Sequence, residues 1–189
     1  MKSLTAFNLQ AWIDEHRDQL KPPVCNQQVF EENDFIVMIV GGPNSRKDYH
    51  VDEGPELFFQ IEGDMLLKVI VDGKQQDITI HEGDMLLLPP RVPHSPQRFA
   101  DTVGLVVERA RLSHELDGFM WFCDNCANKL YEEYIYVDDI VGQLPPIFER
   151  FYGSEDKRRC DKCGTVMPQP DSVYAIRRHS KLRGRQGPR

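Results

Sequence analysis

The chain has 189 residues, of which 40% are hydrophobic and 28% are charged. These values are typical of a folded globular protein with one core, and they exclude a largely disordered chain. A formal net charge of −7 argues against general nucleic-acid binding. No apolar run reaches the roughly 20 residues of a membrane helix, and the N-terminus lacks the apolar core of a signal peptide. We therefore expect a cytoplasmic protein with neither nucleic-acid nor membrane partners.

The first predicted element is an amphipathic helix near the N-terminus. Leu9, Trp12 and Ile13 recur at helical spacing, and Asn8 is a candidate N-cap residue. The Lys-Pro-Pro sequence at residues 21–23 should end this helix, because proline lacks the amide donor that a helix interior needs. We expect the apolar face of the helix to pack on the structure that follows.

Residues 24–110 are dominated by short β-type runs separated by turn signals. Asp72-Gly73 lies between two of these runs and predicts a type I′ hairpin. The density of short strands, without intervening helices, predicts a mainly β fold built as an antiparallel barrel or a double-sheet roll. The expected strands are Phe35–Val40, Glu56–Ile61, Met65–Val71, Gln76–Ile80, Met85–Leu88 and Thr102–Glu108.

Beyond residue 111 the sequence is mixed and less periodic. Residues 144–152 predict a helix that begins after two prolines and carries Ile147, Phe148 and Phe151 on one face. The segment 177–189 is basic and contains glycine and proline, so we expect a flexible tail.

These patterns divide the chain into three predicted regions. Residues 1–111 form a barrel core with its N-terminal helix, and residues 112–176 form a C-terminal segment with a metal site packed on the barrel. Residues 177–189 form the basic tail.

Four of the five cysteines form two Cys-x2-Cys pairs. In a reducing compartment such pairs favour a metal site over disulfides. Four thiolates suit Zn²⁺ or a single iron, and they close the coordination shell, so we expect a structural role. Separate buried thiols and a transient redox pair are the alternatives. The four residues are Cys123, Cys126, Cys160 and Cys163, and Cys25 is expected to be a buried, inert thiol.

A second candidate metal site combines His50, Glu56 and His94. Two imidazoles and one carboxylate are the ligand set that holds non-haem Fe(II) and leaves positions open. Phe58 shares a strand face with Glu56, because successive side chains alternate along a strand. A lone histidine on a sheet face is more often a hydrogen-bonded core residue, so the prediction depends on the combination and on its spacing.

The spacing resembles the two sequence motifs of the cupin superfamily, whose fold is a double-stranded β-helix, or jelly-roll barrel. Asp52 occupies the second histidine position of the first motif, while Arg91 and Arg98 replace the glycine and asparagine of the second. The residues that match are His50, Glu56, Gly63, Gly83, Pro89 and His94.

Three charged residues near these motifs are candidate substrate contacts. Arg46 and Arg98 would give the cavity a positive flank, and a guanidinium binds a carboxylate through two hydrogen bonds. Glu108 ends a run that otherwise looks buried, so its carboxylate needs a partner or a function. The alternative is that all three residues form surface or structural ion pairs.

Longer strings in the chain resemble the 3-hydroxyanthranilate 3,4-dioxygenase family, namely residues 41–50, 87–98 and 106–109. Residues 117–119 and 152–160 resemble its shorter bacterial form, which carries a rubredoxin-like four-cysteine site. The resemblance implies catalytic Fe(II) on His50, Glu56 and His94, and a second iron or zinc on the four cysteines.

The resemblance also implies an extradiol-type ring cleavage. The substrates would be 3-hydroxyanthranilate, from the kynurenine route of tryptophan breakdown, and O2. The product would be 2-amino-3-carboxymuconate semialdehyde, which closes to quinolinate on the way to NAD. Arg46, Arg98 and Glu108 would contact oxygen or substrate, and Glu56 and Phe58 would line the substrate site.

Within this reading, Arg98 binds the ring carboxylate with help from Arg46, and Glu108 moves the phenol proton or holds the amine. We expect a homodimer. The alternatives are a non-catalytic cupin that binds an aromatic acid, and a cupin enzyme with another reaction.

Overall fold

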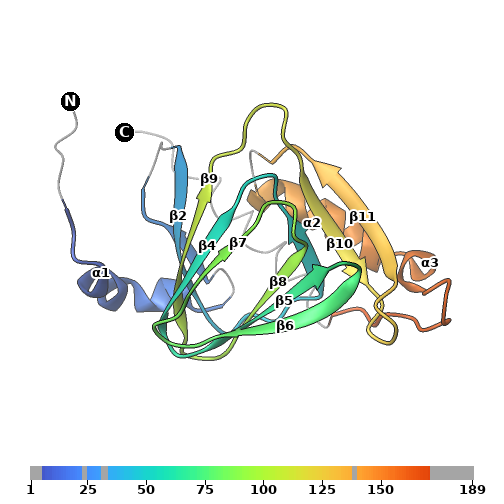
Figure 1. Ribbon diagram of the computed structural model, residues 1–189, viewed down its shortest axis with the longest axis horizontal. Helices are drawn as coiled ribbons and strands as arrows, with labels where there is room; N and C mark the ends of the chain where they lie inside the picture. The colour runs from blue at the N-terminus through green and yellow to red at the C-terminus, as the bar shows by residue number, and fades with distance from the viewer. Residues whose placement is uncertain (1–5, 23–24, 31–33, 138–139, 171–189) are drawn as a thin grey trace, which may run out of the picture.

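Two antiparallel β-sheets form the body of the protein in the computed structural model (Figure 1), which describes residues 6–22, 25–30, 34–137 and 140–170. The five-stranded sheet has the order β1 (Asn26–Gln28), β2 (Phe35–Gly41), β9 (Val103–Arg109), β4 (Glu56–Glu62), β7 (Met85–Leu88). The six-stranded sheet has the order β11 (Lys129–Ile135), β10 (Asp117–Phe122), β3 (Asp48–Val51), β8 (His94–Arg98), β5 (Met65–Val71), β6 (Lys74–Ile80). The predicted mainly β, double-sheet cupin fold is confirmed.

The space between the sheets is filled by apolar side chains of alternating strand positions, as expected for a half-buried sheet. Their burial stabilises the fold through the area removed from water. The buried members are Phe58, Met65, Leu67, Val69, Ile80, Leu88 and Val106. The hairpin between β5 and β6 has the predicted turn, with φ of 51° at Asp72 and 70° at Gly73.

The N-terminal helix covers part of the outer face of the five-stranded sheet. Helix α1 (Leu9–His16) is capped by Asn8, whose Oδ1 accepts a hydrogen bond from the Ala11 amide at 2.9 Å. It continues as a 3-10 turn, η1 (Arg17–Leu20), before Lys21 becomes extended. Ile13, in α1, packs on Ile39 and Val103 of the sheet. The predicted helix and its cap are therefore confirmed, with a tighter last turn.

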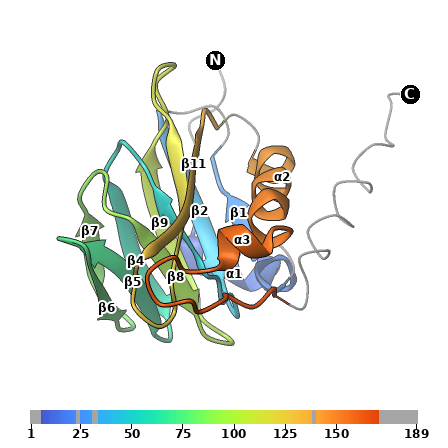
Figure 2. The same ribbon diagram turned by 90° about the vertical axis from the view of Figure 1, so that its right-hand side faces the viewer.

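The C-terminal segment adds two strands that the sequence did not predict. Strands β10 and β11 extend the six-stranded sheet beside β3. Helix α2 (Ile140–Tyr152) packs on β10, and the short α3 (Glu155–Arg158) follows it beside β11, as Figure 2 shows. The rings of Trp121 and Phe151 stack with centroids 4.4 Å apart. Helix α2 begins before Pro145 and Pro146, so the prediction that it starts after them was wrong.

The remaining outcomes concern predictions outside the sheets. Cys25 is a free thiol that is 6% exposed, as predicted. The tail at residues 177–189 lies outside the described residues. The three-region division of the chain stays a prediction. Within the described ranges, no helix combines the length and apolarity that a membrane crossing demands.

Candidate metal centre

The three predicted ligands come together from three strands of both sheets. His50 on β3 and His94 on β8 are paired residues of the six-stranded sheet. Glu56 begins β4 in the opposite sheet. One candidate ligand atom from each side chain lies within 4.8 Å of the others. The set therefore bridges the two layers at one end of the core.

The orientation of His94 indicates that a cation belongs between it and Glu56. His94 Nδ1 donates a hydrogen bond to the Val92 carbonyl at 3.0 Å, so in the neutral ring Nε2 carries a lone pair. Glu56 Oε2 lies 2.9 Å from that Nε2 and has no hydrogen-bond partner among the described residues. Two electron-pair donors facing each other this closely need a proton or a metal ion between them. The donor set fits a divalent metal ion.

The electrostatics of this pair agree with that reading. Burial alone raises the pKa of Glu56, but His94, His50 and Arg111 together outweigh burial and leave the pKa lowered. Burial lowers the pKa of His94, and the Glu56 carboxylate more than reverses that effect. The lowered pKa of Glu56 favours the ionised carboxylate, which is the form that binds a metal, whereas the raised pKa of His94 favours a proton on the ring, which a metal ion would have to replace.

His50 is held by a different contact. Its Nε2 donates a hydrogen bond to Asp117 Oδ2 at 2.7 Å, and its ring stacks on Phe119 at a centroid distance of 5.4 Å. Asp117 and Phe119 both belong to β10. A histidine that donates from one nitrogen to a carboxylate keeps a lone pair on the other nitrogen for a metal.

Arg111 is a site residue that the sequence analysis missed. It lies in the loop between β9 and β10, with a side chain that is 6% exposed. It forms ion pairs with Asp52 at 3.2 Å, with Glu108 at 3.0 Å and with Asp117 at 2.8 Å. The available signal was the buried acid Glu108 followed three positions later by an arginine, within reach of a turn.

The position of Asp52 explains the departure from the first cupin motif. Its Oδ1 accepts a hydrogen bond from the Gly54 amide at 2.7 Å, and its Oδ2 faces Arg111. Asp52 is absent from the group of mutually close ligand atoms. It supports the turn before β4 and leaves three ligands rather than four.

The predicted substrate contacts occupy different environments. Arg46 pairs with Asp48, to which its Nε donates at 3.0 Å. Glu108 is the cross-strand neighbour of Glu56. Phe58 is 1% exposed, with its ring centroid 6.0 Å from that of His94.

Arg98 differs because it lacks an acidic partner. It is 5% exposed, and no carboxylate of the described residues lies within ion-pair distance of it. Its Nη1 makes only a long hydrogen bond, 3.4 Å, to Gln60 Oε1. A Cβ atom at Gly104 would lie 2.6 Å from this Nη1, so only glycine leaves room for the guanidinium. Burial lowers the pKa of Arg98 to about 10.

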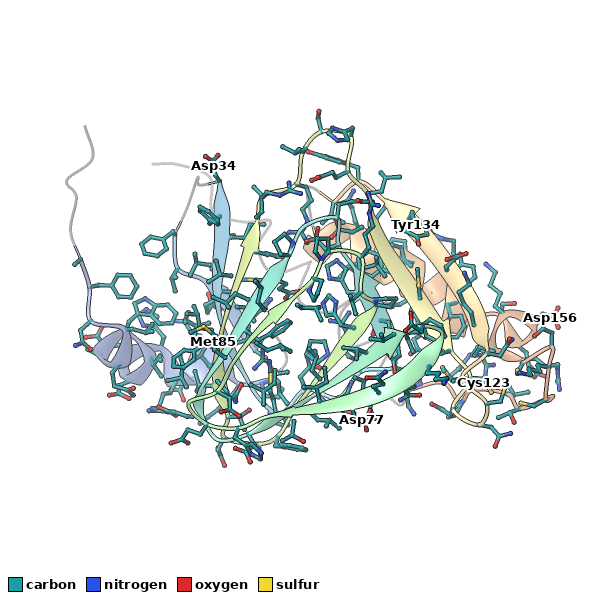
Figure 3. The ribbon with its side chains drawn as sticks, viewed as in Figure 1. Asp34, Asp77, Met85, Cys123, Tyr134 and Asp156 are labelled. Atoms are coloured by element: carbon teal, nitrogen blue, oxygen red, sulfur yellow. The ribbon has the colours of Figure 1, made fainter. Side chains whose placement is uncertain are left out.

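The four predicted cysteines also meet. Cys123 Sγ lies 3.5 Å from Cys163 Sγ, and Cys126 Sγ lies 3.6 Å from Cys160 Sγ. These distances are too long for disulfides and suit four thiolates around one ion. The group lies at the end of β10 nearest α3, where Figure 3 labels Cys123. The prediction of a four-cysteine cluster is confirmed, and its metal remains unassigned.

Two antiparallel sheets that present two imidazoles and one carboxylate at one end of their core define a cupin-type metalloprotein. The profile of the 3-hydroxyanthranilic acid dioxygenase family matches residues 1–152. The chain belongs to this family of enzymes.

Similar proteins extend over most of the chain. A "3-hydroxyanthranilate 3,4-dioxygenase" of Xanthomonas oryzae pv. oryzae (strain MAFF 311018) is 54% identical over 170 residues, covering 90% of this chain and 96% of that protein. A protein of the same name from Paraburkholderia phytofirmans is 52% identical, covering 86% and 94%. Among solved structures, a cupin-2 domain containing protein from Shewanella frigidimarina is 19% identical with a TM-score of 0.42, covering 55% of this chain and 100% of that chain.

Proposed function

We propose that this chain is an Fe(II)-dependent 3-hydroxyanthranilate 3,4-dioxygenase. It would open the ring of 3-hydroxyanthranilate with O2 to give 2-amino-3-carboxymuconate 6-semialdehyde, so that both oxygen atoms enter the product. The observation that carries the proposal is the meeting of the three ligands, together with a buried arginine on β8, the strand of His94, that forms no ion pair with a carboxylate of the described residues. Family membership and relatives above 50% identity support the same reading.

His50, Glu56 and His94 would hold the iron. Spin rules make O2 alone slow to react with the ring. Bound Fe(II) would supply this reactivity, because it links oxygen and the ring electronically while holding both. The protein supplies position: three ligands on three strands of two sheets fix the ion rigidly against the apolar wall that contains Phe58.

The carboxylate of the substrate is assigned to Arg98, with Arg46 as the second cation. A buried guanidinium without a protein carboxylate has lost its hydration and gained no ion pair in return. An aromatic acid that enters the core supplies that pair. Arg46 already neutralises Asp48, so its contribution to the acid, or to charge that develops on oxygen, is smaller.

We assign to Glu108 the transfer of the phenol proton of the substrate. Burial raises the pKa of this carboxyl to about 7, while Arg111 pulls it in the opposite direction. A carboxyl that titrates near neutral pH can take a phenol proton and return it later. Its place opposite Glu56 across β4 and β9 brings it next to the metal ligands.

We assign the second metal, iron or zinc, to the four cysteines as a structural ion. All four positions of a tetrahedral ion are filled by the thiolates, so no position is open to substrate. Free cysteines arranged as metal ligands fit a reducing compartment, and we therefore propose the cytoplasm.

We also propose a homodimer and a place in the kynurenine route toward quinolinate and NAD. The outer face of the five-stranded sheet leaves Phe35, Met85 and Leu87 more than half exposed, at 56%, 65% and 63%. A second copy of the chain would cover this apolar surface. Light scattering of the purified protein tests the dimer, and a monomer at all concentrations would refute it.

The function is tested with protein loaded anaerobically with Fe(II). Addition of 3-hydroxyanthranilate and O2 should consume one O2 per substrate and produce the absorbance of the semialdehyde. 2-Aminophenol, which lacks the carboxylate, should be a poor substrate. His94→Ala should abolish turnover, whereas His81→Ala, which changes an exposed histidine paired with Asp64, should leave it intact.

Two outcomes would contradict the proposal. Absence of O2 uptake with a full complement of bound iron would exclude the dioxygenase. Tight binding of the acid without turnover would instead support the non-catalytic cupin.

A further inference from the structure

A buried charge cluster lies directly behind the metal ligands. It contains Arg111 and three carboxylates, and each carboxylate residue is at most 5% exposed. Arg111 lies within 3.2 Å of Asp52, Glu108 and Asp117. One guanidinium therefore forms ion pairs with three carboxylates, in a core where an unneutralised carboxylate is costly.

The cluster joins the same two sheets as the metal ligands do. Glu108 belongs to β9 of the five-stranded sheet, and Asp117 belongs to β10 of the six-stranded sheet. Asp52 directly follows β3, the strand that carries His50. Arg111 lies in the loop that carries the chain from one sheet to the other. Its planar fork can bind two carboxylates at fixed angles, which an ammonium group cannot do.

The contact that matters is shared at one oxygen atom. Asp117 Oδ2 accepts from His50 Nε2 at 2.7 Å and from Arg111 Nη2 at 2.8 Å. Arg111 thus restrains rotation of the Asp117 carboxylate at the same oxygen atom that binds His50. Without Arg111, this carboxylate would be free to turn, and the imidazole would lose its fixed direction.

We propose that Asp117 and Arg111 are positioning residues for the metal centre. Arg111 fixes the carboxylate of Asp117, and Asp117 fixes the ring of His50 so that its other nitrogen faces Glu56 and His94. The same guanidinium holds Glu108 in place across from Glu56. The inference rests on the proposed function only in that His50 is taken as a metal ligand.

A purely structural role would have a different signature. Removal of one partner from a buried ion cluster destabilises the fold in any case. Removal of a positioning residue, in addition, weakens metal binding in protein that remains folded. The affinity of the folded apo-protein for a metal ion therefore separates the two.

Mn²⁺ is a suitable probe, because imidazole and carboxylate ligands bind it and thiolates do not favour it. The electron paramagnetic resonance signal of free Mn²⁺ gives its affinity directly. Asp117→Asn keeps the shape of the side chain and removes its charge, and we expect affinity to fall about 10- to 100-fold. Arg111→Lys keeps the charge and loses the fork, and we expect a smaller loss in the same direction.

Arg109→Lys is the matched control. Arg109 lies two positions before Arg111 and also pairs with an acid, but its side chain is 33% exposed and its ion pair is with Glu115 rather than with a carboxylate of the cluster. We expect wild-type Mn²⁺ affinity in this variant. Circular dichroism establishes which variants are folded before affinity is compared.

Wild-type Mn²⁺ affinity in folded Asp117→Asn protein would overturn the proposal. Should Asp117→Asn fail to fold, Arg111→Lys decides the matter, and wild-type affinity there would overturn the proposal equally. The dioxygenase proposal fails separately, because wild-type protein that binds metal but consumes no O2 would leave this positioning role intact.

Discussion

Replacing Arg98 by methionine should make the free protein more stable and the enzyme much worse. Methionine has a similar length and fills the same apolar space without a charge. The environment of Arg98 is unusual because the residue is 5% exposed and, within the described part of the chain, its guanidinium makes one long hydrogen bond, 3.4 Å to Gln60 Oε1. The two effects have opposite signs, and this separates a functional arginine from a structural one.

The magnitude of the stability effect follows from the pKa of Arg98, which falls from 12.5 to about 10 on folding. A basic group with a lower pKa in the folded state is disfavoured in its charged form. That cost is fully present below about pH 10 and disappears above the unfolded value. At roughly 1.4 kcal/mol per pKa unit, the charge costs the fold on the order of 3 kcal/mol at neutral pH. Arg98→Met should recover part of it.

The effect of Arg98→Met on substrate binding is unfavourable. Loss of a buried charge pair with the substrate carboxylate costs roughly 2–5 kcal/mol. This corresponds to a rise in KM of about 30-fold to several thousand-fold. Activity toward 2-aminophenol, which has no carboxylate, should change far less than activity toward 3-hydroxyanthranilate.

The assays are urea unfolding of the apo-protein and initial rates with both substrates. Arg91→Met is the control, since Arg91 is exposed and pairs with Glu53 on the surface. It should shift stability by less than about 1 kcal/mol and leave KM unchanged. An Arg98→Met protein that is less stable than wild type and has a normal KM would refute the reasoning.

Three further substitutions test other parts of the structure. Glu56→Gln should abolish iron binding, yet change apo-protein stability by no more than about 1 kcal/mol, because the new amide can donate to His94 Nε2; retained iron by metal analysis would contradict this. Cys126→Ser should remove the metal of the four-cysteine group and lower the melting temperature while barrel iron remains. Loss of turnover with fold and barrel iron intact would show that the group is more than structural. Trp121→Ala should destabilise the protein by about 3–5 kcal/mol, since Trp121 is fully buried against Phe151; a urea midpoint near wild type would count against this packing.

The strands that could be predicted are those with local sequence signals. Strands β2, β4, β5, β7 and β9 follow apolar runs bounded by turn residues, and β6 follows from the hairpin signal Asp72-Gly73. Strand β8 contains Pro96, which sequence patterns exclude from central strands. Strand β10 is buried on both faces, so it lacks the alternation that marks a half-exposed strand. These two strands carry His94 and Asp117, so function and poor predictability coincide.

The candidate metal ligands could be predicted because their spacing resembles two sequence motifs. Arg111 could not, because its role depends on which carboxylates the loop between the sheets approaches. Glu108, Asp52 and Asp117 are far apart in sequence or on different strands, and only the closed double sheet brings them to one guanidinium. A pattern on one strand cannot show a contact that spans two sheets.

Two buried arginines, Arg98 and Arg111, differ in their ion pairs, and this difference bears on function. The sequence analysis singled out Arg98 and missed Arg111. In the structure, Arg111 has three carboxylates, whereas Arg98 has none among the described residues. Among the described residues, one buried guanidinium thus pairs with three carboxylates and the other forms no ion pair. Because an unpaired charge destabilises a core, the lack of an ion pair at Arg98 supports our proposal that the carboxylate of the substrate binds there.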